Sequence, residues 1–293
     1  MRKIKKLFNK YLKKIDPNRE IVFNYENFFI HLPSDHLLPA YQKEHKKYDR
    51  FLSHLVSFIE DKKTVIDVGA NVGDTLAGMF NTNPNLDYVC IEPDTIFFDY
   101  LEKNTKRIRD SFKFAKIRGV QSLVGKAINN VLLEGSGGTK HAVYQTSSTT
   151  SDKNLIQSKQ LDQIVDELGC INVRLLKTDI DGFDWDAIES ARGLLINQRP
   201  MVFFECQYDE EYQINCYQDT ITWLSSIGYC NWTIFDNFGE IILKTDKVEY
   251  IFQLMNYIWR QNCELSTRTI YYCDILAATE NDAALVSKAI SEY

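Results

Sequence analysis

The chain has 293 residues, enough for one large domain with a full hydrophobic core or for two small ones. Hydrophobic residues make up 44% and charged residues 25%, as in ordinary globular proteins, and no apolar run approaches the roughly 18 residues that a membrane-spanning helix needs. The net charge of −6 disfavours a general nucleic-acid-binding protein, because contacts to phosphates require an excess of basic residues.

The cysteines and the N-terminus bear on the compartment. Seven cysteines, an odd number without a C-x-x-C pair, are typical of a reducing environment. The first residues lack the apolar segment of a signal peptide. We therefore expect a cytoplasmic protein.

Residues 1–18 predict a basic amphipathic helix. Its polar positions are mainly lysine, and its apolar positions fall on one helical stripe: Ile4, Leu7, Phe8, Tyr11, Leu12 and Ile15. Such a helix can lie on an anionic membrane surface, or it can pack on its own domain or on a sister chain. We treat residues 1–39 as an N-terminal extension with a candidate peripheral membrane contact, and residues 40–293 as one domain.

The segment before the first predicted strand is mixed. Phe23–Leu32 fits either strand or loop, and Tyr48–Ile59 has the apolar spacing of a helix. A segment in this position can fold over a binding crevice, which makes four of its side chains candidate contacts: His36, His45, Tyr48 and Arg50.

The stretch from Thr64 to Thr75 predicts a strand, a tight turn and a helix that continues to Phe80. Gly69 would offer bare backbone that a ligand can approach, and Gly73 would let the helix pack near the strand. The spacing is G-x-x-x-G. It differs from the G-x-G-x-x-G that cradles a pyrophosphate, so the turn is less suited to a dinucleotide.

A second strand, Tyr88–Ile91, ends in Glu92, about 20 residues after Gly73. An acid at this distance is the usual partner of ribose hydroxyls at the tip of the neighbouring strand. Together the two strand ends predict a nucleoside site. The alternative for Glu92 is a solvated acid at a strand end.

The next predicted elements are a helix over Thr95–Arg107 and a strand over Gly119–Ile128, whose end would place Ala127 near the crevice. A hairpin of Val131–Glu134 with Ala142–Gln145 follows.

A third informative stretch begins with an apolar strand near Val173 and runs into Asp179 and Asp181. A helix over Trp185–Leu195 should follow, and then a strand over Pro200–Gln207 that carries Glu205 near its end. Acids from adjacent strand ends can bind a cationic group, hold a metal or take a proton.

The C-terminal third continues the alternation of helices and strands. We expect helices over Tyr212–Ile227 and Val248–Trp259, and strands over Asn231–Phe235, Glu240–Leu243 and Thr269–Ala277. The whole pattern predicts a doubly wound α/β domain whose sheet is mostly parallel, with antiparallel C-terminal strands.

Five separated segments resemble, in order, the signatures of the FkbM family of S-adenosylmethionine-dependent methyltransferases: Ile66–Thr75, Glu92–Pro93, Leu161–Asp162, Lys177–Asp184 and Pro200–Glu205. Thr178 and Asp181 stand where the family more often has isoleucine and glutamate. The resemblance implies a class I, Rossmann-like methyltransferase domain that uses S-adenosylmethionine. It also implies a small-molecule or glycan acceptor, methylated on a hydroxyl group.

The resemblance also implies roles for individual residues. The turn from Gly69 to Gly73 would bend around the methionine end of the cofactor, Glu92 would hold the ribose, and Asp179 would lie near the sulfonium or the acceptor. Asp67 would sit near the cofactor amino group, or else be a buried acid satisfied by backbone donors. The full cofactor set, with Asp94 and Ala127 flanking the adenine, is Asp67, Gly69, Ala70, Asn71, Gly73, Asp74, Thr75, Glu92, Asp94, Ala127 and Asp179.

A neutral hydroxyl is a poor nucleophile, so a general base would accelerate methyl transfer by about 10²- to 10⁴-fold. The candidates, in order, are Asp181, Asp179 and His141, since histidine titrates near neutral pH. A divalent metal held by Asp179, Asp181 and Glu205 could replace the base by lowering the pKa of the acceptor, although we do not expect one.

Two other functions stay open at this level. One is a nucleotide-dependent dehydrogenase on a similar sheet. The other is a non-catalytic nucleoside-binding partner in surface-polymer assembly. Neither the acceptor nor the oligomeric state follows from the sequence.

Overall fold

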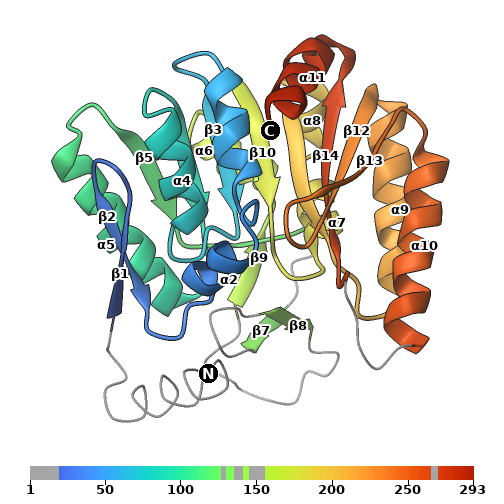
Figure 1. The fold of residues 1–293 in the computed structure, drawn as a ribbon, viewed down its shortest axis with the longest axis horizontal. Helices are drawn as coiled ribbons and strands as arrows, with labels where there is room; N and C mark the ends of the chain where they lie inside the picture. Colours follow the sequence, from blue (N-terminus) through green and yellow to red (C-terminus); the bar gives the residue numbers. More distant parts are fainter. Residues whose placement is uncertain (1–19, 127–129, 135–140, 145–155, 265–269) are drawn as a thin grey trace.

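The computed structural model of the chain describes residues 20–126, 130–134, 141–144, 156–264 and 270–293. An eight-stranded sheet with helices on both faces organises this part of the molecule (Figure 1). The predicted helix over residues 1–18 and the predicted adenine contact Ala127 lie outside the described residues. Within the described ranges, no helix is both long and apolar enough to cross a membrane.

The strands of the main sheet lie in the order β13-β12-β14-β11-β10-β3-β4-β5. Their bounds are β3 (Thr64–Val68), β4 (Asp87–Ile91), β5 (Lys116–Val120), β10 (Val173–Thr178), β11 (Met201–Cys206), β12 (Tyr229–Asp236), β13 (Ile241–Thr245) and β14 (Cys273–Thr279). The strands from β11 to β5 are parallel, whereas β14 is antiparallel to both of its neighbours and β13 is antiparallel to β12. The predicted sheet class is confirmed.

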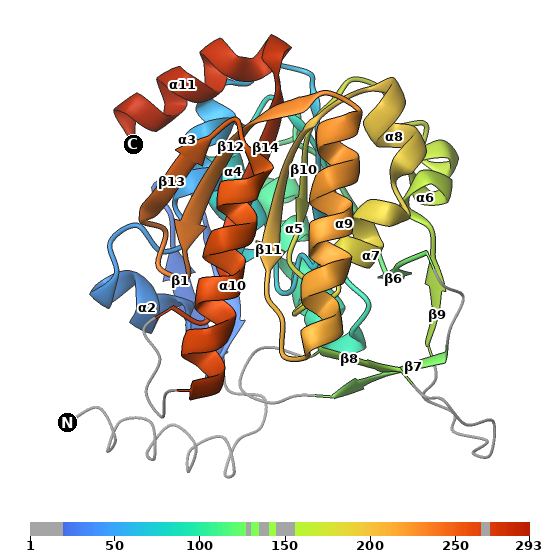
Figure 2. The same cartoon turned by 90° about the vertical axis from the view of Figure 1, so that its right-hand side faces the viewer.

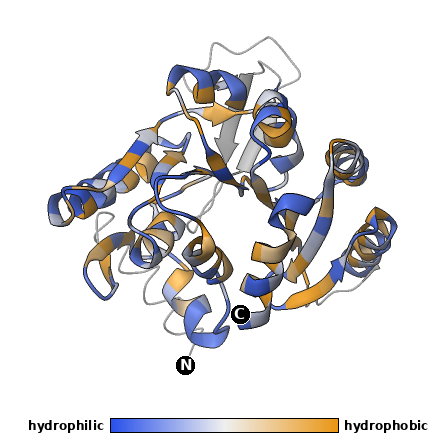
Figure 3. Cartoon of the chain, turned by 90° about the horizontal axis from the view of Figure 1, so that it is seen from above, coloured by the Kyte–Doolittle hydropathy of each residue, from blue (hydrophilic) through white to orange (hydrophobic). Residues whose placement is uncertain are grey.

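Two hydrophobic clusters fill the space on the two faces of the sheet. The first includes residues of α3 (Phe51–Leu55), α4 (Asp74–Thr82), α5 (Thr95–Ser111) and α11 (Ala283–Glu292). The second includes residues of α6 (Leu161–Glu167), α7 (Asp184–Glu189), α8 (Arg192–Asn197), α9 (Glu211–Ser226) and α10 (Val248–Glu264). Figure 2 shows α9 and α10 side by side on one face. The helices carry both hydrophobic and hydrophilic positions, as helices that flank a sheet do (Figure 3).

A β-hairpin precedes the domain core and packs on α5. It consists of β1 (Glu20–Asn24) and β2 (Phe29–Pro33), and α2 (Leu38–Glu44) follows it. The buried Asn104 of α5 accepts the His31 N–H at 2.8 Å, and it donates to the carbonyl groups of His31 and Val72 at 2.9 Å each. One side chain of α5 therefore joins the hairpin to the turn after β3.

A second, smaller sheet has the strand order β6-β9-β7-β8. Its strands are β6 (Leu123–Val124), β7 (Asn130–Glu134), β8 (His141–Tyr144) and β9 (Ile156–Lys159). The predicted hairpin is confirmed as β7 and β8, which pair antiparallel. In Figure 1 the labels β7, β8 and β9 lie at the same end of the molecule as α2.

The single strand predicted over Gly119–Ile128 is wrong. The chain leaves the main sheet after Val120, which pairs with Ile91, and Leu123 then pairs with Ser158 in the small sheet. Because β5 is the edge strand of the main sheet, no further strand holds the chain there.

The helix predicted over Tyr48–Ile59 is shorter in the structure. It starts only at Phe51 and continues as a 3₁₀ turn, η1 (Val56–Phe58). Asp49 has a φ of 52°, which is incompatible with a right-handed helix at that position. A second 3₁₀ turn, η2 (Glu280–Asp282), precedes α11.

The helix predicted over Trp185–Leu195 is divided into α7 and α8. The Asp162 carboxylate accepts the N–H groups of Gly193 and Leu194 at 2.7 and 2.8 Å, so a new helix start forms there. The side chain of Ser190 accepts the Leu161 N–H at 3.1 Å. The Leu161–Asp162 signature therefore caps a helix and positions the chain between β9 and α6.

Candidate active site

The strand order of the main sheet reverses between β3 and β10. The chain runs from β3 to β4 and β5 on one side, and it later forms β10 and β11 on the other. Ligands of open α/β sheets bind outside the carboxyl ends of the strands at this point. A cavity of about 380 Å³ lies there, lined by residues that follow β3, β4 and β10, by residues near the end of β11, and by the segment before α3.

The turn after β3 is held against the loop after β10. Gly69 has a φ of 76°, and a Cβ at this position would lie 2.0 Å from the carbonyl oxygen of Asp179. The Asp179 N–H donates to the carbonyl oxygen of Val68 at 3.1 Å. The glycine is thus required by the neighbouring backbone, and not only by the approach of a ligand as we expected. Gly73 makes room for Leu101 of α5, whose Cδ1 would lie 2.9 Å from a Cβ at position 73.

Glu92 links the ends of β3 and β4. Its two carboxylate oxygens accept the N–H groups of Asn71 at 2.9 Å and Asp94 at 2.8 Å. Burial raises the pKa of Glu92 to about 7, although both of these hydrogen bonds favour the ionised form. The side chain lines the cavity, and each oxygen can accept a second hydrogen bond.

The predicted cofactor residues divide into two groups. The cavity is lined by Gly69, Asn71, Asp74, Thr75, Glu92 and Asp179, whereas Asp67, Ala70, Gly73 and Asp94 are not among its lining residues. Asp94 instead caps α5, where its side chain accepts the N–H groups of Ile96 and Phe97. Its assignment as an adenine contact stays a prediction.

Asp67 is the partner of a buried lysine that the sequence reasoning missed. Lys177 lies opposite Asp67 in the β10–β3 register, and its Nζ is 2.8 Å from Asp67 Oδ1. The same ammonium donates to the Gly69 carbonyl at 3.0 Å and lies 3.5 Å from Asp179 Oδ2. Burial by itself would lower the pKa of Lys177, but the two carboxylates raise it. A lysine inside a strand expected to be buried on both faces was the available signal, because it requires an acidic partner.

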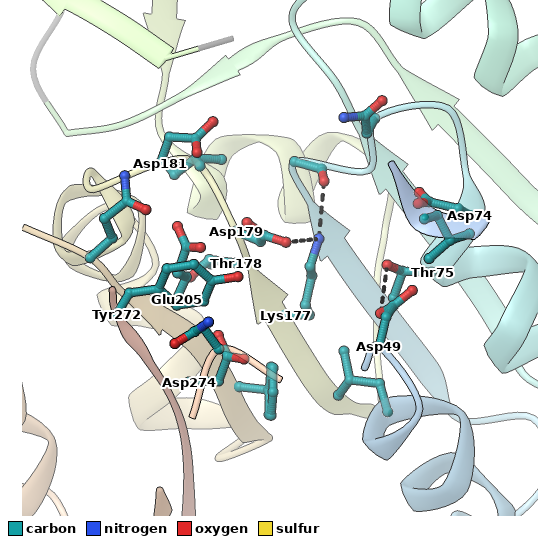
Figure 4. Close-up of a pocket in the computed structure, with 18 of the residues that line it drawn as sticks. Asp49, Asp74, Thr75, Lys177, Thr178, Asp179, Asp181, Glu205, Tyr272 and Asp274 are labelled. Carbon is teal, nitrogen blue, oxygen red and sulfur yellow. Dashed lines mark hydrogen bonds and ion pairs between the residues drawn. The ribbon is translucent and has the colours of Figure 1, made fainter. Parts of the chain in front are cut away.

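The other end of the cavity is acidic. Figure 4 shows Asp181, Glu205, Tyr272 and Asp274 grouped on one side of Asp179, with Lys177 on the other. Asp181 has a φ of 51°, and burial raises its pKa to about 7. Glu205 pairs with Asp274 across β11 and β14, and burial raises the pKa of both carboxyls well above the usual range.

The segment before α3 closes one side of the cavity. His36, Tyr48 and Arg50 line it, as expected, while His45 stacks on Phe238 with ring centroids 3.7 Å apart. Asp49, which we did not single out, also lines the cavity and accepts a hydrogen bond from the Thr75 hydroxyl at 3.3 Å. Its left-handed backbone places it there.

The remaining catalytic candidates lie in two different parts of the structure. His141 is the first residue of β8 in the small sheet, and its role as a base stays a prediction. Asp179, Asp181 and Glu205 line one cavity. However, no group of three or more His, Cys, Asp or Glu side chains in the described part of the chain is arranged to hold a metal ion.

The fold defines the class of protein. The sheet has five parallel strands, β11, β10, β3, β4 and β5, with a switch point between β3 and β10. Beside β11 lies β14, which is antiparallel to it. This arrangement is a class I, Rossmann-like methyltransferase fold. Residues 67–248 match the family model described as Methyltransferase FkbM domain, and the chain belongs to this family of S-adenosylmethionine-dependent methyltransferases. Among curated proteins, none matches the chain.

Several solved structures are similar at low identity. Methyltransferase FkbM from Methylobacillus flagellatus KT has 16% identity and a TM-score of 0.40 over 82% of this chain, and the match spans 58% of that protein. A SAM dependent methyltransferase from Agrobacterium tumefaciens has 6% identity and a TM-score of 0.46, covering 90% of this chain and 72% of that one. The plantazolicin methyltransferase BpumL, solved in complex with SAH, has 12% identity and a TM-score of 0.37, covering 83% and 89%.

Proposed function

We propose that the protein transfers a methyl group from S-adenosylmethionine to a hydroxyl group on a sugar, a glycan or a related metabolite. The observation that carries the proposal is the link between the turn after β3 and the end of β4. Glu92 accepts the N–H group of Asn71 and still faces the cavity. A carboxylate fixed in this way is suited to accept both hydroxyls of a ribose.

The charges around the cavity fit this cofactor better than a dinucleotide. S-adenosylmethionine supplies an electrophilic methyl group on a cationic sulfur. The carboxyl groups of Asp74 and Asp179 line the cavity, where they would attract a cation and repel a pyrophosphate. This arrangement opposes the alternative of a nucleotide-dependent dehydrogenase, as does the G-x-x-x-G turn.

Asp181 is the side chain that we propose as general base. It lines the cavity, and its pKa of about 7 suits proton transfer at neutral pH. Asp179 Oδ2 lies 3.5 Å from the Lys177 ammonium, and we assign Asp179 to the stabilisation of positive charge. Alignment of the acceptor oxygen about 3 to 3.5 Å from the methyl carbon supplies the remaining acceleration.

We also propose a cytoplasmic location. All seven cysteines are free thiols, which is usual in a reducing compartment. A peripheral membrane contact through residues 1–18 remains part of this proposal.

Calorimetry with S-adenosylhomocysteine tests the cofactor assignment. We expect the wild-type protein to bind it and not to bind NAD. Glu92→Gln should weaken binding by about tenfold or more, because the amide has one acceptor oxygen and no charge. Asp87→Asn, at the opposite end of the same strand, is the matched control and should bind like wild type. Absence of heat with S-adenosylhomocysteine, or tighter binding of NAD, would contradict the proposal.

A further inference from the structure

Glu205 is a buried acid with an unused oxygen on the cavity wall. Its side chain lines the cavity, yet the residue is only 6% exposed. Its Oε2 has no hydrogen-bond partner among the described residues. A buried carboxyl oxygen without a partner is costly, and native structures rarely retain one without a reason.

The surroundings of Glu205 do not supply a compensating charge. Asp274 lies opposite Glu205 in the strand register, and Asp181 and Asp179 lie in the loop beyond β10 (Figure 4). The basic side chains that line the described cavity form ion pairs or hydrogen bonds with groups other than Glu205. Lys177 pairs with Asp67 and Asp179, Lys47 with Glu240, Arg50 with Gln42, and His36 with Asp74. This end of the cavity therefore has more carboxyl groups than basic side chains to pair with them.

The position of Glu205 separates it from the proposed ribose site. β11 lies beside β10, and β3 and β4 come after β10 in the sheet order. Neighbouring strands are about 4.8 Å apart, so Glu205 is about 14 Å from the strand that carries Glu92. The acid lies toward the end of the cavity where the acceptor would bind.

We propose that this end of the cavity binds a primary ammonium group of the methyl acceptor, such as the amine of an amino sugar. Oε2 of Glu205 would accept one N–H group, and the carboxyl of Asp274, opposite Glu205 in the strand register, would accept another. An ammonium has three donors and no acceptor, which matches this set of oxygens. The inference rests on the proposed methyltransferase function and narrows the acceptor class.

Matched pairs of probes test this assignment. The probes are methyl glycosides of 2-, 3-, 4- and 6-amino sugars, each compared with its N-acetyl derivative. Binding to the protein saturated with S-adenosylhomocysteine is measured by ligand-observed NMR. At least one free amine should bind about tenfold more tightly than its N-acetyl partner, because only the amine carries a charge.

Variants assign the effect to the acid. Glu205→Gln should abolish the preference for the amine and leave the affinity for S-adenosylhomocysteine unchanged. Asp274→Asn should reduce the preference, and it serves as the second variant if Glu205→Gln does not fold. Glu211→Gln, on the exposed start of α9, is the control and should behave like wild type.

Three results would overturn the inference. No amine in the panel exceeds its N-acetyl partner, the preference survives both substitutions, or Glu205→Gln weakens S-adenosylhomocysteine binding as strongly as amine binding. The last result would assign the acids to the amino group of the cofactor. If S-adenosylhomocysteine itself does not bind the wild-type protein, the proposed function fails instead, so the two failures are distinguishable.

Discussion

Gly69 and Gly169 show how one backbone conformation can have two different consequences. Both residues have a positive φ, 76° and 60° respectively. A Cβ at position 69 would meet the Asp179 carbonyl oxygen at 2.0 Å, whereas a Cβ at position 169 would have no atom within 4 Å apart from those of the glycine and its two chain neighbours. The first glycine holds two strand ends together at the cavity, and the second only ends a turn after α6.

Gly69→Ala should therefore be more destabilising than Gly169→Ala. Both variants place alanine in a left-handed conformation, but only the first forces backbone apart, which should add about 1–3 kcal/mol to its cost. The free energies of unfolding in urea measure this difference. Gly69→Ala should also weaken binding of S-adenosylhomocysteine, measured by calorimetry, because the displaced loop carries Asp179. Equal effects of the two substitutions would show that the close approach is unimportant.

At the scale of elements, the N-terminal hairpin and α5 form a unit through Asn104. This side chain is fully buried, and its three hydrogen bonds join β2 to the turn after β3. That turn forms one wall of the cavity, so the packing of the hairpin supports the site. The hairpin itself precedes residue 67, where the match to the family model begins.

Asn104→Ala should lower the free energy of unfolding by about 3 kcal/mol, because it leaves the buried carbonyl of Val72 and two partly buried backbone groups of His31 without these partners. Hydrogen exchange of residues 29–33 should become faster than in wild type. Lys106→Ala, on the exposed side of the same helix, is the control, with an expected effect within about 0.5 kcal/mol. Unchanged exchange in the hairpin would contradict this account of its attachment.

At the scale of the whole molecule, several acids in and beside the cavity have a raised pKa. Burial raises the pKa of Glu92 and Asp181, which line the cavity, to about 7 each, and it does the same for the fully buried Asp184 of α7. In the unfolded chain these carboxyls titrate near 4. Between these values the folded protein binds more protons than the unfolded chain does, so its stability falls as the pH rises.

The ligand-free protein should therefore lose stability as the pH rises from about 4.5 to about 7, and Glu92 alone should account for roughly 3 kcal/mol of that loss. Urea unfolding at a series of pH values measures the effect. Glu92→Gln should flatten the dependence. A stability that stays constant or rises through this window would show that these carboxyls are ionised without a ligand.

The fold class follows from local patterns in the sequence, and the same patterns predict where the candidate site lies. The β-branched run before Gly69, the acid at Glu92 and the acids after β10 are local patterns, and their order along the chain implies a parallel sheet with one crevice. Local patterns also mark helix and strand interiors well. They fail where a distant side chain decides the boundary, as Asp162 does when it starts α8.

Which side chains face one another depends on contacts between distant segments and could not be predicted from the sequence. The pairing of Lys177 with Asp67 and of Glu205 with Asp274 depends on the register between strands that are far apart in the chain. A shift of one residue would turn each side chain to the other face of the sheet. The position of Asp49 likewise depends on a left-handed residue in a segment without a strand or helix. These contacts, which set the charge of the cavity, arise from packing between distant segments and have no local signature.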